Sequence, residues 1–64
     1  MIHPLVLWRA QTNQTQLAAA KAMKVSLPTW KHWESGVSFP KVERMAKLTK
    51  LTGVTRAQLE AARG

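Results

Sequence analysis

The sequence predicts an all-α fold built from five short helices. Apolar residues recur every three or four positions, as they do on one side of a helix, and no segment shows the alternation of a strand. Turn-forming residues interrupt this pattern at four places, namely residues 12–15, 24–28, 36–40 and 53–55. The chain has 64 residues, so we expect residues 1–64 to form a single domain with a small core.

The first helix is expected to begin at Pro4, because the first helical position does not need an N–H donor. Helical spacing continues through Trp8 to about Gln11. Thr15 is a suitable N-cap for a second helix of about eight residues that ends before Val25. The apolar face of this second helix carries Ala19, Ala20 and Met23.

The third helix has two possible starts. Ser26 is a good N-cap, but the residue before a proline avoids helical dihedrals, so Leu27 could be the cap with Pro28 at the first helical position. The helix is expected to stop at Gly36, a residue that adopts the left-handed conformation readily. Its apolar side is formed by Trp30 and Trp33, which we expect in the core.

Pro40 is expected to open a fourth helix that ends at Gly53. Thr55 and Gln58 have the spacing of a capping box for a last short helix that carries Leu59. One side of the fourth helix is predicted to hold Val42, Met45, Leu48 and Thr49.

The charge of the chain points to a polyanionic partner. Ten Lys and Arg residues against three Glu residues give a formal net charge of +7, spread along the chain. Such a balance is typical of proteins that bind nucleic acid. A membrane surface is the less suitable polyanion, because a helix that lies on a membrane shows one continuous amphipathic pattern.

Several other classes of function are disfavoured. The chain has no cysteine, and its two histidines have no cluster of other ligands, so we expect no metal and no cofactor. Scattered glutamates and the lack of a Gly-rich phosphate loop argue against an enzyme and against a small-molecule substrate. Apolar runs such as residues 5–8 are too short for a membrane span or a signal peptide, so we expect a cytoplasmic protein.

The spacing within residues 16–34 predicts a helix-turn-helix. Small Ala20 suits a steep helix crossing, and Trp30 and Trp33 can clamp the second helix of the pair. The opposite side of that helix would then face outward and could enter a major groove. The candidates for contact with bases are Leu27, Pro28, Lys31, His32 and Ser35.

The chain resembles the Cro and repressor family of phage and bacterial helix-turn-helix regulators. The resemblance rests on Trp8-Arg9, Thr15-Gln16, Ala19-Ala20, Val25-Ser26 and Trp33-Glu34-x-Gly36, and continues in Pro40, Met45, Leu48 and Gly53-Val54-Thr55. It implies a compact five-helix, lambda-repressor-like DNA-binding domain. It also implies a structural salt bridge between Arg9 and Glu34, to which two solvated charges are the alternative.

The same resemblance implies that Gln16 and the start of its helix meet the DNA backbone, where exposed helix N–H groups favour anions. The full set of backbone candidates is Thr15, Gln16, Ser26, Thr29, Ser38 and Lys41.

The chain departs from the family pattern in three respects. Lys24 replaces a turn glycine and would be strained if its φ is positive. Ala19 is smaller than the residue the family has at its position, and Trp30 is larger than the family's residue at its own. The indole of Trp30 can therefore fill the volume that Ala19 leaves in the core. Pro28 replaces a polar residue, so the leading end of the third helix could contact bases only through apolar groups such as thymine methyls. Lys31 would then reach either guanine O6 and N7 or a phosphate.

Together these features predict a sequence-specific regulator that binds double-stranded DNA, of the phage Cro-like repressor type, which acts by occupying its operator. The family implies a homodimer on a pseudo-palindromic operator, with an interface around residues 55–63. The alternatives are an antitoxin-type regulator and a protein-interaction module that has lost DNA binding.

Overall fold

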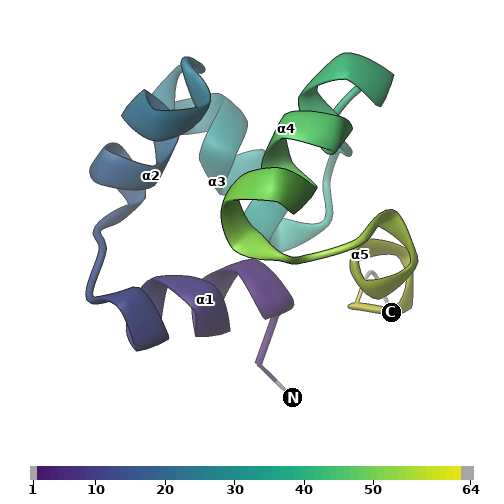
Figure 1. The fold of residues 1–64 in the computed structure, drawn as a ribbon, viewed down its shortest axis with the longest axis horizontal. Coiled ribbons are helices and arrows are strands. Elements are labelled where there is room, and N and C mark those ends of the chain that lie inside the picture. Colours follow the sequence, from purple (N-terminus) through teal and green to yellow (C-terminus); the bar gives the residue numbers. More distant parts are fainter. Residues whose placement is uncertain (1, 63–64) are drawn as a thin grey trace.

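The structure is a computed structural model that describes residues 2–62. All regular structure in this range is helical, which confirms the predicted all-α fold with five helices (Figure 1). The helices are α1 (Pro4–Thr12), α2 (Gln16–Met23), α3 (Leu27–Ser35), α4 (Val42–Thr52) and α5 (Arg56–Ala62). Helix α2 packs against α3 and α4, and α1 packs against α3 and α5.

One hydrophobic core joins all five helices, because each of them contributes one large side chain that is fully buried. These side chains are Leu5, Met23, Trp30, Leu48 and Leu59. Trp30 lies between the two other indoles, with ring centroids 6.1 Å from Trp8 and 5.9 Å from Trp33. The tilted geometry of both pairs is the favourable one for aromatic rings. The tryptophans therefore belong to the core, as their spacing predicts.

The predicted capping residues define most helix ends. The Thr15 hydroxyl accepts a hydrogen bond from the Ala18 N–H, and Gly36 and Gly53 end their helices with φ of 79° and 77°. Thr55 and Gln58 form the capping box, in which each side chain accepts from the other's backbone N–H.

The start of α3 decides between the two alternatives left open by the sequence. Ser26 is the N-cap, and its hydroxyl accepts from the Thr29 N–H. Leu27 is already helical, so Pro28 occupies the second helical position instead of the first.

The predicted start of α4 is wrong. The helix begins at Val42 with Lys41 as its N-cap, and Pro40 lies buried in the extended loop before it. Val42 is 77% exposed, although its spacing from Met45 places it on the inward side. Residues 41–44 are all exposed, so the first turn of α4 extends beyond the core.

Candidate nucleic-acid interface

The turn between α2 and α3 holds the two helices of the helix-turn-helix together. Ala20 is only 1% exposed and lies in the core where α2 packs against α3. The N–H groups of Lys24 and Val25 each donate to carbonyls at the end of α2, at 3.0 Å. Lys24 itself has φ of 57°, so this lysine adopts the left-handed geometry that glycine adopts more readily.

Helix α3 presents one exposed edge. Its exposed residues are Pro28, Lys31, His32 and Ser35, at spacings of three and four that place them along one side of a helix. On the opposite side, Trp30, Trp33 and Glu34 are buried. Leu27 is half-buried at the first helical position, next to this edge. We call these four exposed residues together with Leu27 the recognition edge.

The Glu34 carboxylate ties three helices together behind the recognition edge. From α1, the Arg9 guanidinium donates to both carboxylate oxygens, with the Nη2–Oε1 distance 3.0 Å. From α2, the Gln16 amide donates to Oε1 at 2.9 Å. The Trp30 indole N–H donates to Oε2 within α3. Four hydrogen bonds from three elements thus fix the position of α3 relative to α1 and α2.

The electrostatics of Glu34 agree with this arrangement. Its side chain is 6% exposed and that of Arg9 is 19% exposed. Burial acts to raise the pKa of Glu34, but the hydrogen bonds from Arg9, Gln16 and Trp30 and the positive charge of Arg9 outweigh it. The pKa of the carboxyl therefore lies below its ordinary value of 4.5. Glu34 is held as a carboxylate with its charge compensated.

Several predicted backbone contacts have side chains that are already engaged within the protein. The Gln16 amide points inward to Glu34 instead of outward. Thr15 and Ser26 use their hydroxyls as helix caps, and the Ser26 and Thr29 hydroxyls lie 2.8 Å apart in a mutual hydrogen bond. Among these candidates, Ser38 and Lys41 lie exposed on the loop between α3 and α4.

The hydroxyl of Ser35, at the C-terminal end of the recognition edge, also has an internal partner. It donates to the His32 carbonyl at 3.1 Å, so it remains only as an acceptor for an external group.

Although the basic residues are spread along the chain, most of them lie in the part that carries this edge. Seven of the ten basic residues lie between positions 21 and 50, against Glu34 and Glu43, and they are Lys21, Lys24, Lys31, Lys41, Arg44, Lys47 and Lys50. Outside this segment, Arg9 is paired with Glu34, and Arg56 with Glu60. Helices α2 to α4 therefore carry the field that would attract a polyanion.

The family model for a helix-turn-helix domain matches residues 5–62, which is nearly all of the chain. The chain belongs to the helix-turn-helix domain family. Membership indicates a DNA-binding regulator, and domains of this family are typically not enzymes. No curated protein and no solved structure matched the chain. The helix-turn-helix domain has no helix within residues 2–62 that is long and apolar enough to cross a membrane.

Proposed function

We propose that this helix-turn-helix domain is a sequence-specific, Cro-like repressor, of the kind encoded by phages, that acts by occupying an operator in double-stranded DNA. The observation that carries the proposal is the recognition edge, because α3 exposes this edge while Glu34 and the tryptophans hold the opposite side rigidly in the core. A rigid helix with an exposed polar and apolar edge fits the major groove, whose base pairs each present a distinct pattern of groups.

The residues of the recognition edge offer different contacts. Pro28 is exposed and Leu27 half-buried, so the leading end of α3 suits thymine methyl groups. Lys31 is exposed and suits guanine O6 and N7. His32 and the acceptor oxygen of Ser35 would contact bases further along the helix. The backbone contacts would come from the N-terminus of α2, with Ser38 and Lys41 on the loop after α3.

Regulation by operator occupancy requires no more than binding. We propose a homodimer on a pseudo-palindromic operator, with half-site centres about 34–36 Å apart, which is one turn of DNA. A core this small and a net charge of +7 are consistent with a protein that is stabilised further by its DNA partner.

Selection of bound duplexes from a random pool tests this function. We expect a recovered motif with two-fold symmetry, and an affinity for it that falls with salt by a log-log slope of about −0.9 for each phosphate neutralised. Recovery of no motif, together with an affinity that does not depend on salt, would reject DNA binding and favour a protein-interaction module.

The role of Lys31 can be tested on the selected duplex. If Lys31 contacts guanine, Lys31→Ala should weaken binding to the selected duplex by about 1–3 kcal/mol. The variant should then no longer discriminate between bases at that one position of the duplex. If it contacts phosphate, the loss is the same for every single-base variant of the duplex. Lys50→Ala, on α4, is the matched control for the loss of one positive charge.

A further inference from the structure

The turn between α2 and α3 carries a lysine in a conformation that lysine usually avoids. Within residues 2–62, Lys24 and Asn13 are the residues other than glycine with positive φ, at 57° and 59°. Lysine lacks the short polar side chain that helps asparagine in this region. Strained residues cluster at functional sites, where the surrounding structure maintains the strain. The conformation of Lys24 therefore indicates a function for its side chain.

Three cations gather around this turn. Lys21 lies one helical turn before Lys24, and its carbonyl accepts a hydrogen bond from the Lys24 N–H at 3.0 Å. From α4, the Arg44 guanidinium donates to the Met23 carbonyl at 3.4 Å, which places it at the end of α2. All three side chains are exposed, and none of them forms an ion pair within residues 2–62. We call Lys21, Lys24 and Arg44 the turn cluster.

The turn cluster suits an anion with several oxygens. Like charges held close together repel, and the carbonyls at the C-terminus of α2 offset only part of this repulsion. Arg44 uses one of the five N–H donors of its guanidinium on Met23, so the group is oriented at the turn and has further donors to offer. An oriented guanidinium beside a lysine is a typical combination for binding phosphate.

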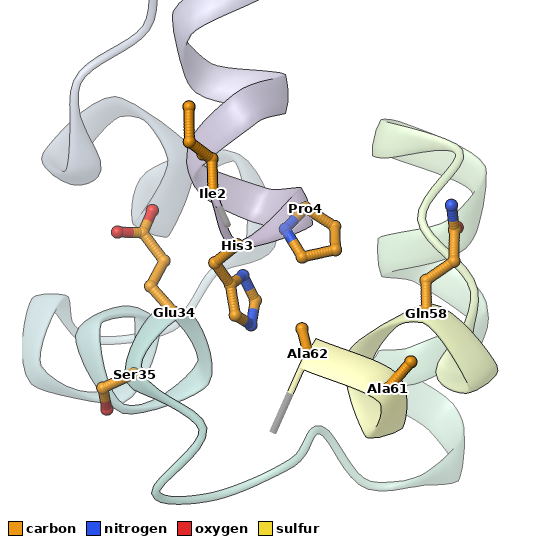
Figure 2. A pocket seen from close by; sticks show the side chains of 8 residues that line it. All are labelled: Ile2, His3, Pro4, Glu34, Ser35, Gln58, Ala61 and Ala62. Carbon is orange, nitrogen blue, oxygen red and sulfur yellow. The ribbon is translucent and has the colours of Figure 1, made fainter. Parts of the chain in front are cut away.

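The turn cluster lies at the leading end of the recognition helix. Lys24 is two residues before the N-cap of α3. At the other end of α3, Glu34 and Ser35 border a depression of about 510 Å³ that also adjoins α1 and α5 (Figure 2). The interface predicted around residues 55–63 falls on that side, and Arg63 lies outside the described residues. A recognition helix contacts bases mainly with its N-terminal residues, so the turn cluster belongs to the end that enters the groove.

The width of the major groove brings this end of α3 close to the DNA backbone. A helix with its side chains is about 10–12 Å wide, and the groove is about 12 Å wide. A helix that fills the groove therefore leaves the segments at its ends beside the phosphates that border it. The hydroxyls of Ser26 and Thr29, at the start of α3, already bond to each other at 2.8 Å. Lys24 and Arg44 offer donors at the same place.

We infer that the turn cluster binds a phosphate of the operator backbone, with Lys24 as the principal contact and Arg44 beside it. The inference rests on the proposed function, because the phosphate belongs to the duplex that the recognition edge contacts. It adds residues that the sequence did not mark as backbone contacts. The strain at Lys24 is then a loss of stability that is maintained in exchange for DNA affinity.

Substitution of Lys24 separates stability from affinity. Lys24→Gly relieves the strain and removes the charge, so this variant should melt at a higher temperature than the wild-type chain and bind the selected duplex more weakly. Its log-log slope of affinity against salt should be smaller by about 0.9, the contribution of one phosphate. The ratio of wild-type to variant affinity should therefore fall by about threefold between roughly 50 and 200 mM salt. The loss should be the same for every single-base variant of the duplex.

Two further variants control for the charge and for its position. Lys24→Arg keeps both the charge and the left-handed strain, so it should bind and melt like the wild-type chain. Lys50→Ala removes one exposed lysine from the last turn of α4, away from the turn cluster. It should leave the salt slope unchanged and the affinity within about twofold.

Fluorescence anisotropy of a labelled duplex measures these affinities. The inference is overturned if Lys24→Gly binds as tightly as the wild-type chain with the same salt slope, or if its loss is confined to one base pair. Equal losses in Lys24→Gly and Lys24→Arg would also reject it, because the charge that arginine retains would then make no contribution. If the wild-type chain itself has no salt-dependent affinity for any duplex, the proposed function fails as well, so the two failures are distinguishable.

Discussion

The Glu34 side chain has the largest structural role of any single residue at the candidate site. It is the only acid in the first forty-two residues, and it accepts hydrogen bonds from Arg9, Gln16 and Trp30. Loss of one partner from a buried pair leaves an uncompensated charge in the core. The position of the recognition edge therefore depends on a residue that does not contact DNA in our account.

A double-mutant cycle measures this coupling. Arg9→Met and Glu34→Leu should each lower the free energy of unfolding by about 3–5 kcal/mol, because each leaves the other charge unpaired. The double variant should lose at least about 1 kcal/mol less than the sum of the two. Urea denaturation gives the three values. Losses that simply add would show that the ion pair makes no net contribution.

Backbone strain at Lys24 predicts a substitution that raises the free energy of unfolding instead of lowering it. With φ of 57°, a lysine pays a steric penalty that glycine does not, so Lys24→Gly should raise the free energy of unfolding by about 1 kcal/mol. Gly53→Ala is the matched control. Its φ is +77° and a new methyl group would meet no atom within 4 Å, so its expected loss of about 1 kcal/mol reports strain alone. A loss of stability in Lys24→Gly, measured by thermal melting, would contradict the account of the turn.

At the scale of the helix, α1 begins with a cap that titrates. The neutral His3 ring accepts a hydrogen bond at Nδ1 from the Leu5 N–H, at 3.1 Å. Its Nε2 is buried and has no hydrogen-bond partner among the described residues. Burial lowers the pKa of His3 below its ordinary value of 6.5, against the negative charge of Glu34, which acts to raise it. Protonation would replace the acceptor at Nδ1 with a donor and break the cap.

The stability of the domain should therefore depend on pH in two steps. The unfolded state takes up the His3 proton first, so stability should fall as pH drops below about 6.5 and through the lowered pKa of the folded state. A second fall should follow below 4.5, as Glu34 is protonated through its own lowered pKa. Melting temperature against pH measures both steps.

Replacement of the cap separates the two steps. His3→Asn can still cap α1 but does not titrate, so this variant should lose the first step and keep the second. If the first step remained unchanged in His3→Asn, another group would be responsible for it.

Helix boundaries show how far local sequence rules reach. Thr15, Ser26, Gly36 and Gly53 mark helix ends where capping rules place them, because these signals act within a few residues. Pro40 misleads because proline suits both a first helical turn and the extended chain before a helix, and only packing of the loop decides between them.

Side-chain partners from different helices were harder to foresee. The resemblance implies the Arg9–Glu34 pair, but the inward turn of Gln16 depends on how α1, α2 and α3 pack. The cap at His3 is local, but histidine is not among the preferred N-cap residues. The bond from Trp30 to Glu34 had a signal in the sequence, since residues four apart on a helix are neighbours. Exposure of Val42 could not be deduced from periodicity, which does not say where the core ends.

For the whole molecule, charge and shape divide the surface into two parts. Helices α2 to α4 carry most of the positive charge, and the surface between α1 and α5 exposes the apolar side chains of Ile2 and Leu7. A polyanion is therefore expected to meet the charged part of the surface. The charge was visible in the sequence, but the apolar part became visible only when α1 and α5 were brought together.

The most direct test of the central claim is an NMR titration of labelled protein with the duplex recovered by selection. The account predicts the largest amide shifts at Lys31 and His32 on the recognition edge and at Thr29, which follows Pro28 in the chain. It predicts large shifts also at the N-terminus of α2. Shifts confined to the basic residues of α4 or to α1 and α5, with α3 unchanged, would contradict it.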